Sequence, residues 1–147
     1  MKTLIKILCL NVFIAYTLSE ELNAIEIEYL CTVEDFTTKS RSDSYFIKSN
    51  LKKIFVLNFK KDTVQVTQIC TDCISKKNES IYKIISKEWN GIIAFELTDK
   101  VDYKGIKTTQ IDYGDALTFY HDDKVGTITL MNPTYTNTWF LDCEVTE

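Results

Sequence analysis

The sequence predicts an all-β protein, either a small antiparallel β-barrel or a β-sandwich of about 8–10 short strands. Apolar and polar residues alternate with a period of two along most of the chain, as in half-buried strands. Turn-forming residues recur at intervals of about 8–12 residues, and no stretch of eleven or more keeps a helical period. The barrel is favoured over the sandwich because closure removes exposed strand edges.

The first 24 residues are predicted to be a secretory signal peptide and not part of this fold. Lys2 and Lys6 precede an apolar run over residues 7–16, and a polar stretch then ends at the small residue Ala24. Cleavage is expected after Ala24, or alternatively after Ser19. The apolar run is shorter than the roughly 20 residues that a stable membrane span needs. We therefore expect residues 25–147 to form a single secreted or periplasmic β-domain.

The two terminal strands are predicted at residues 25–33 and 135–145, each with one apolar face. Cys31 and Cys143 both fall on the apolar faces. Outside the predicted leader the chain keeps four cysteines, an even number that suits an oxidising compartment and allows three pairings. A Cys31–Cys143 disulfide would join the first strand to the last. Cys70 and Cys73 would then form a local disulfide, with a redox dithiol or half of a zinc site as the alternatives.

The strands between these two are predicted from alternating or continuous apolar residues bounded by turn signals. Lys61-Asp62, Trp89-Asn90-Gly91 and Asp122-Asp123-Lys124 are the clearest turns, and the polar loop at residues 75–80 contains the N-glycosylation acceptor Asn78-Glu79-Ser80. The expected strands are residues 53–60, 63–69, 81–86, 92–97, 107–113, 116–120 and 126–131, with a further short strand at residues 45–48.

The sequence predicts no catalytic residue, no metal site and no cofactor. His121 is the single histidine and lies at a predicted turn, and no Gly-x-Ser-x-Gly elbow is present, so a nucleophilic triad is disfavoured. Together with Asp112, Asp115, Asp122 and Asp123 it offers an alternative cation site, but acidic residues at turns are usually solvated turn formers. No feature distinguishes Glu34, Glu88 or Glu96 as a catalytic acid. A net charge of −4 without basic clusters argues against nucleic acid.

Aromatic side chains are the most informative group, because a small barrel either fills its interior with them or leaves room for one apolar ligand. A filled core is the simpler interpretation. The residues predicted to line such a ligand site are Tyr29, Phe55, Tyr82, Phe95, Phe119, Tyr135 and Trp139.

A signal peptide, about eight strands and a disulfide between the chain ends together resemble the lipocalin-type calycins in architecture. The Gly-x-Trp of their first strand is missing, and Trp89-Asn90-Gly91 lies in mid-chain in a different order, so no site residue follows from the resemblance. We expect an exported, non-enzymatic β-barrel that binds a small apolar ligand or a protein partner. The alternatives are an interaction module with a filled core and, after it, a secreted hydrolase or thiol redox protein.

Overall fold

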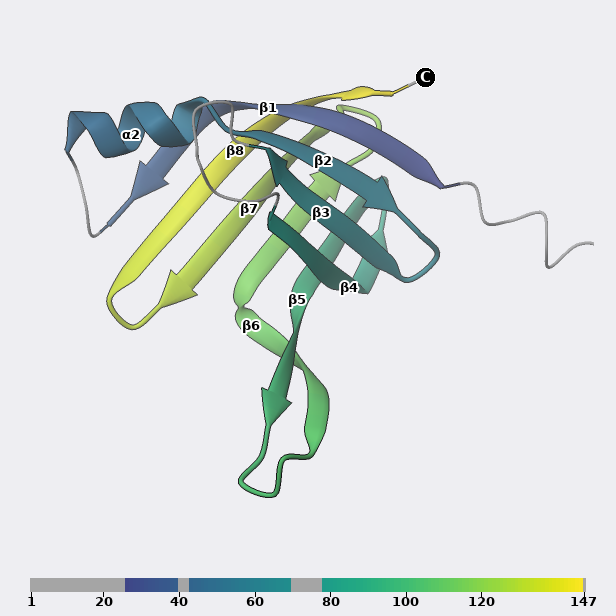
Figure 1. The fold of residues 1–147 in the computed structure, drawn as a ribbon. Helices are drawn as coiled ribbons and strands as arrows, with labels where there is room; N and C mark the ends of the chain where they lie inside the picture. Colours follow the sequence, from purple (N-terminus) through teal and green to yellow (C-terminus); the bar gives the residue numbers. More distant parts are fainter. Residues whose placement is uncertain (1–25, 40–42, 70–77, 147) are drawn as a thin grey trace, which may run out of the picture.

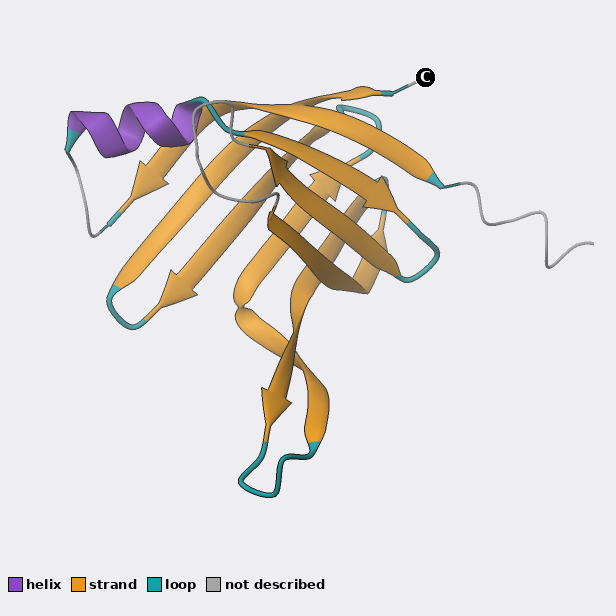
Figure 2. Ribbon diagram, viewed as in Figure 1, coloured by secondary structure: helices purple, strands orange, loops and turns teal. Residues whose placement is uncertain are grey.

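The computed structural model describes residues 26–39, 43–69 and 78–146, which form a closed antiparallel barrel (Figures 1 and 2). Each strand pairs with the next along the chain, and β8 returns to pair with β1. This confirms the predicted all-β barrel and excludes the sandwich. The strands are β1 (Ile27–Thr38), β2 (Ile54–Phe59), β3 (Thr63–Ile69), β4 (Asn78–Glu88), β5 (Gly91–Val101), β6 (Lys107–Tyr120), β7 (Val125–Asn132) and β8 (Tyr135–Val145).

The β1–β8 seam that closes the barrel contains the disulfide between Cys31 and Cys143. The two residues are direct register partners on these strands and are 0% and 3% exposed. The structure therefore forms the pairing that joins the first strand to the last. Cys70, Cys73 and the predicted leader at residues 1–24 lie outside the described residues.

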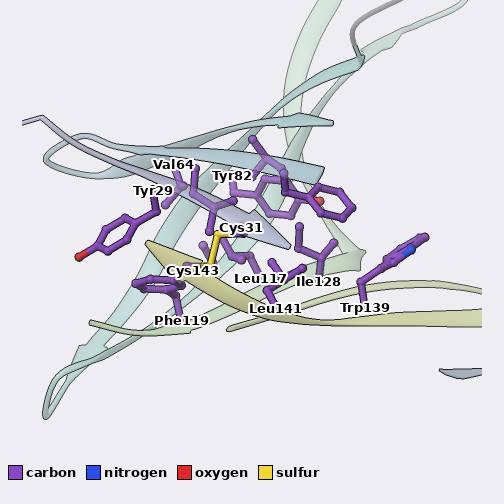
Figure 3. Packing of buried hydrophobic residues seen from close by; sticks show 14 of the residues in the cluster. Tyr29, Cys31, Val64, Tyr82, Leu117, Phe119, Ile128, Trp139, Leu141 and Cys143 are labelled. Carbon is purple, nitrogen blue, oxygen red and sulfur yellow. A yellow bond between two sulfur atoms is a disulfide. The ribbon is translucent and has the colours of Figure 1, made fainter. Parts of the chain in front are cut away.

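Side chains alternate between the two faces of each strand, so every second residue points into the barrel and contributes to its core. In β2, for example, Phe55, Leu57 and Phe59 are buried while the residues between them are half-exposed. Figure 3 shows the disulfide near the middle of this core, with Tyr29 and Phe119 on one side and Tyr82 and Trp139 on the other. The barrel therefore has two chemically different ends.

The turn end carries the β2–β3, β4–β5 and β6–β7 turns and is filled by aromatic rings. The ring centroids of Tyr29 and Phe119 are 4.7 Å apart, and those of Phe59 and Phe119 are 5.0 Å apart. His121 packs against Phe59 at 4.9 Å, and the Tyr29 hydroxyl lies 3.2 Å from His121 Nδ1. Burial lowers the pKa of His121, an effect that the charge of Asp122 partly opposes. These contacts form an aromatic cluster at the turn end.

The opposite, helix end contains the one helix of the described residues, α2 (Ser44–Leu51). The strand predicted at residues 45–48 is therefore wrong. The Asp43 carboxylate caps the helix by accepting a hydrogen bond from Phe46 N at 2.9 Å, and the Phe46 ring packs edge-on against Phe36. Capping and packing override the β-propensity of this short apolar run. No helix in the described part of the chain is long and apolar enough to cross a membrane.

Several strands also run further than the sequence predicts. β1 continues to Thr38, and β4 begins at Asn78, so the glycosylation acceptor Asn78 lies on a strand and not in a loop. The strands predicted at residues 107–113 and 116–120 are one strand, β6. Its first half pairs only with β5, and together they form a ribbon that projects from the barrel (Figure 1).

Candidate functional site

A cavity of about 190 Å³ opens inside the barrel at the helix end. We call this cavity the cup. Apolar and aromatic side chains form part of its wall, and amide, hydroxyl and carboxyl groups form the rest. The cup is lined by Phe55, Val66, Gln68, Asn78, Ser80, Tyr82, Glu96, Asp115, Ile128, Leu130 and Trp139.

The same alternation that fills the core directs the polar groups into the cup. On β5, Ile92 and Ala94 are buried, and Glu96 is the next residue in that phase. On β6, Leu117 and Phe119 are buried, and Asp115 precedes them in the same phase. On both strands, therefore, the interior residues are apolar near the turn end and polar near the helix end.

A bulge between β5 and β6 brings the two acidic residues together. Phe95 pairs with Ala116, but the next residue of β5, Glu96, pairs with Asp112, so residues 113–115 of β6 have no partner on β5. Gly114, in the middle of the bulge, lies close to the backbone of β7. A Cβ atom at this position would lie only 2.6 Å from the Met131 carbonyl oxygen, so glycine is needed here. Gly114 N donates a hydrogen bond of 2.8 Å to Asp112 Oδ1, which fixes the bulge.

Glu96 and Asp115 form a hydrogen-bonded carboxyl pair. Burial is the main cause that raises the pKa of Asp115 to about 8, followed by the hydrogen bond to Glu96 and the negative charges of Glu96 and Asp112. The raised pKa favours the protonated form of Asp115, and a protonated carboxyl group can donate a hydrogen bond to Glu96. The pair still brings negative charge into the cup, and no Lys or Arg side chain is among the described residues that line it.

Tyr82 presents a buried polar group to the cup. Its side chain is 5% exposed, and its hydroxyl makes no hydrogen bond to a residue that the structure describes. Burial raises the Tyr82 pKa, and the charges of Glu96 and Asp115 raise it further, so this group remains a neutral hydroxyl. A hydroxyl that borders the cavity without a described protein partner is available to a ligand or to water.

The aromatic wall is held in place from outside the cup. Trp139 Nε1 donates a hydrogen bond of 3.1 Å to Oδ1 of Asn50, a residue of α2 that is only 3% exposed. Lys53, which does not line the cup, places its ammonium 4.7 Å from the centre of the Trp139 ring. Burial lowers the pKa of Lys53. The helix therefore positions Trp139 as one rigid side of the site.

Three of the predicted lining residues, Phe55, Tyr82 and Trp139, meet in the cup. Tyr29 and Phe119 belong to the packed turn end instead, and Tyr135 is half-buried on β8 outside the cup lining. Phe95 follows the buried Ala94, faces out of the barrel, and contacts the exposed Tyr113 with a centroid distance of 5.1 Å.

Sequence reasoning missed the polar half of the cup. Its signal was the phase of alternation, which places Glu96 after Ala94 and Asp115 before Leu117. The grouping of His121 with Asp112 and Asp115 is not formed, because His121 lies at the turn end and the two aspartates at the helix end. Among the residues described, no three His, Cys, Asp or Glu side chains are arranged to hold a metal ion.

A larger space of about 380 Å³ lies at the turn end, beside Lys60, Lys61, Lys87 and Trp89. It is more open, and Trp89 at its border is 95% exposed. The cup has the better defined chemistry, because it pairs an aromatic wall with carboxyl groups that lie inside the barrel. Comparison with known protein families, with characterised proteins and with solved structures finds no match for this chain.

Proposed function

We propose that this chain is an exported, non-enzymatic β-barrel protein that binds one small ligand in the cup. The observation that carries this proposal is a cavity with an aromatic wall and a few converging polar groups, at one end of a barrel whose middle is a packed apolar core. Ligand sites in proteins are typically concave, largely apolar and supplied with a small number of placed polar groups.

The size of the cup limits the ligand. An apolar cavity of about 150 Å³ holds benzene, and drug-sized ligands need about 300–1,000 Å³. A cup of about 190 Å³ therefore suits one ring with a short substituent. The apolar ligand expected from the sequence is thus narrowed to a small molecule with an apolar body and a polar group.

The disulfide supports the export part of the proposal. A buried bond between Cys31 and Cys143 forms and persists in an oxidising compartment. The predicted signal peptide at residues 1–24 would deliver the chain there. Both arguments favour a secreted or periplasmic protein.

The carboxyl pair supports binding rather than hydrolysis. Glycoside hydrolases keep their two carboxyl groups about 5–9.5 Å apart, so that a sugar or a water fits between them. Glu96 and Asp115 are instead hydrogen-bonded to each other. His121, the one histidine of the chain, is engaged with Tyr29 at the other end of the barrel.

The β5–β6 ribbon supports a second candidate, the protein-partner function. It exposes apolar and aromatic side chains away from the barrel core, namely Val101, Tyr103, Ile106 and Tyr113. Exposed apolar residues gathered on one element are typical of interaction sites. In this alternative the ribbon binds a partner and the cup holds only water.

Fluorescence of Trp139 tests the proposal. The W89F variant leaves Trp139 as the single tryptophan, and small ring compounds (benzyl alcohol, indole, 2-phenylethylamine) are titrated into it. We expect a saturable change in emission for at least one compound. Adding S80F should abolish the change, because Ser80 lines the cup.

Adding I81F serves as the matched control, since Ile81 is the next residue of β4 and is exposed on the outer face. It should leave the response unchanged. If no compound changes the Trp139 emission of the folded protein, or if S80F binds as well as the parent, the cup is not the binding site and the ribbon becomes the favoured candidate.

A further inference from the structure

None of the described residues that line the cup is a cation that could balance its negative charge. The carboxyl groups of Glu96 and Asp115 face the cavity, the described salt bridges involve neither residue, and the described lining contains no Lys or Arg. Asp112 adds further negative charge from the neighbouring bulge. A charge that is partly removed from water without a partner is unfavourable, so a cationic ligand would gain electrostatic free energy here.

The Tyr82 hydroxyl provides a second, independent indication of a ligand. The Tyr82 side chain is 5% exposed and lines the same cavity as the carboxyl pair, and its hydroxyl has no hydrogen-bond partner among the described residues. A hydroxyl that borders a cavity without a protein partner is available to a ligand. Its oxygen can accept a hydrogen bond from a donor that also reaches the two carboxyl groups.

The ligand must therefore carry several donors on one positive centre. A primary ammonium has three N–H donors and no acceptor, which matches two carboxyl groups and one hydroxyl. Phe55 and Trp139 border the same space, and aromatic faces attract both cations and apolar rings. The cup thus presents acceptors for the charged head and an apolar wall for the body of one molecule.

We propose that the cup is a site for a small primary amine, whose protonated nitrogen lies between Glu96, Asp115 and Tyr82 and whose ring lies against Trp139. This inference rests on the proposed function, because it assigns a chemical class to the ligand of the same cup. An amine of the size of 2-phenylethylamine fits the limit set by the volume of about 190 Å³.

Ammonium binding should also change the protonation of the carboxyl pair. A neighbouring positive charge favours the ionised form of Asp115. The charged groups already around Asp115 are Glu96 and Asp112, which are negative, and the neutral Tyr82 hydroxyl faces it from β4. Asp115 then releases its proton when the amine binds near neutral pH. A neutral ligand of the same shape does not cause this release.

Calorimetric titration of the full chain compares 2-phenylethylamine with its neutral analogue 2-phenylethanol. We expect the amine to bind at least tenfold more tightly, as a charge-assisted hydrogen bond would predict. Binding heats measured in buffers of different ionisation enthalpy should show proton release for the amine only. E96Q should weaken amine binding about 10–100-fold and leave the alcohol unaffected, and D115N should abolish the proton release.

E144Q is the matched control, because Glu144 is an exposed carboxylate on the outer face of β8. It should change neither ligand. Equal affinity for the amine and the alcohol would overturn the amine assignment and leave the small-ligand proposal standing. The same conclusion would follow if E96Q bound the amine as tightly as the wild type. Failure of both compounds to bind a folded chain, shown by its circular dichroism and intact disulfide, would contradict both proposals.

Discussion

Reduction of the Cys31–Cys143 bond is the perturbation for which the structure predicts the largest loss of stability. The bond joins residues separated by 112 positions, so it closes nearly the whole described chain into a loop. In the chain-entropy model, a loop of this length contributes about 4.8 kcal/mol at 25 °C by restricting the unfolded state. Since domains of ordinary stability unfold at about 5–15 kcal/mol, the reduced protein should be marginally stable.

Urea denaturation followed by far-UV circular dichroism measures this loss. The C70S/C73S variant is compared in its oxidised and reduced forms, so that no other cysteine outside the predicted leader contributes. With a slope near 1.5 kcal/mol per M, the midpoint should fall by about 3 M. T32A/D142A is the matched control, because Thr32 and Asp142 are exposed register partners on the same two strands. It should lose less than about 1 kcal/mol.

A reduced form that loses less than about 1 kcal/mol would refute this reasoning. The β1–β8 hydrogen bonds and the packing around them would then hold the seam without help from the disulfide. An equal loss in T32A/D142A would also contradict it, because the effect would belong to strand pairing and not to the covalent bond.

Three further changes have defined outcomes. The pKa of Asp115 is raised from 3.8 to about 8, so its contribution to the free energy of unfolding is complete below about pH 4 and is lost as the pH rises to about 8. Urea titrations should therefore show D115N stabilised relative to wild type at pH 8. If the difference in unfolding free energy between D115N and wild type is the same at pH 4 and pH 8, this reasoning is contradicted. G114A should lower both stability and ligand binding in the Trp139 fluorescence assay, because its Cβ would meet the Met131 carbonyl at the bulge, whereas G126A, crowded against Thr118 O on the barrel wall, should lower stability alone. N50A should cost about 1–3 kcal/mol in thermal unfolding, because it leaves the indole N–H of Trp139 buried without an acceptor, and a loss below 0.5 kcal/mol would argue against this role.

The strand content and the closing disulfide were predictable because both follow from the period of two. Alternation placed Cys31 and Cys143 on apolar faces, and the structure makes them register partners inside the barrel. Helix α2 was not predictable in this way. It is eight residues long, and its stability depends on the Asp43 cap and on contacts of Phe46 with Phe36 and of Asn50 with Trp139, both outside the helix.

The aromatic wall of the candidate site was accessible from the sequence. Phe55, Tyr82 and Trp139 lie on predicted strands in the buried phase, and the structure brings them to one cavity. The carboxyl pair was missed because its formation depends on register. Glu96 meets Asp115 only through the three unpaired residues of the β6 bulge, and alternation along each strand gives no information about the pairing between strands.

A crystal structure of the protein with 2-phenylethylamine would test the central claim most directly. The account predicts density for the ligand in the cup, with its nitrogen within hydrogen-bonding distance of Glu96, Asp115 and the Tyr82 hydroxyl, and with its ring against Trp139. Ligand density at the turn end beside Trp89, or a cup without ligand at a concentration that saturates the calorimetric signal, would contradict it.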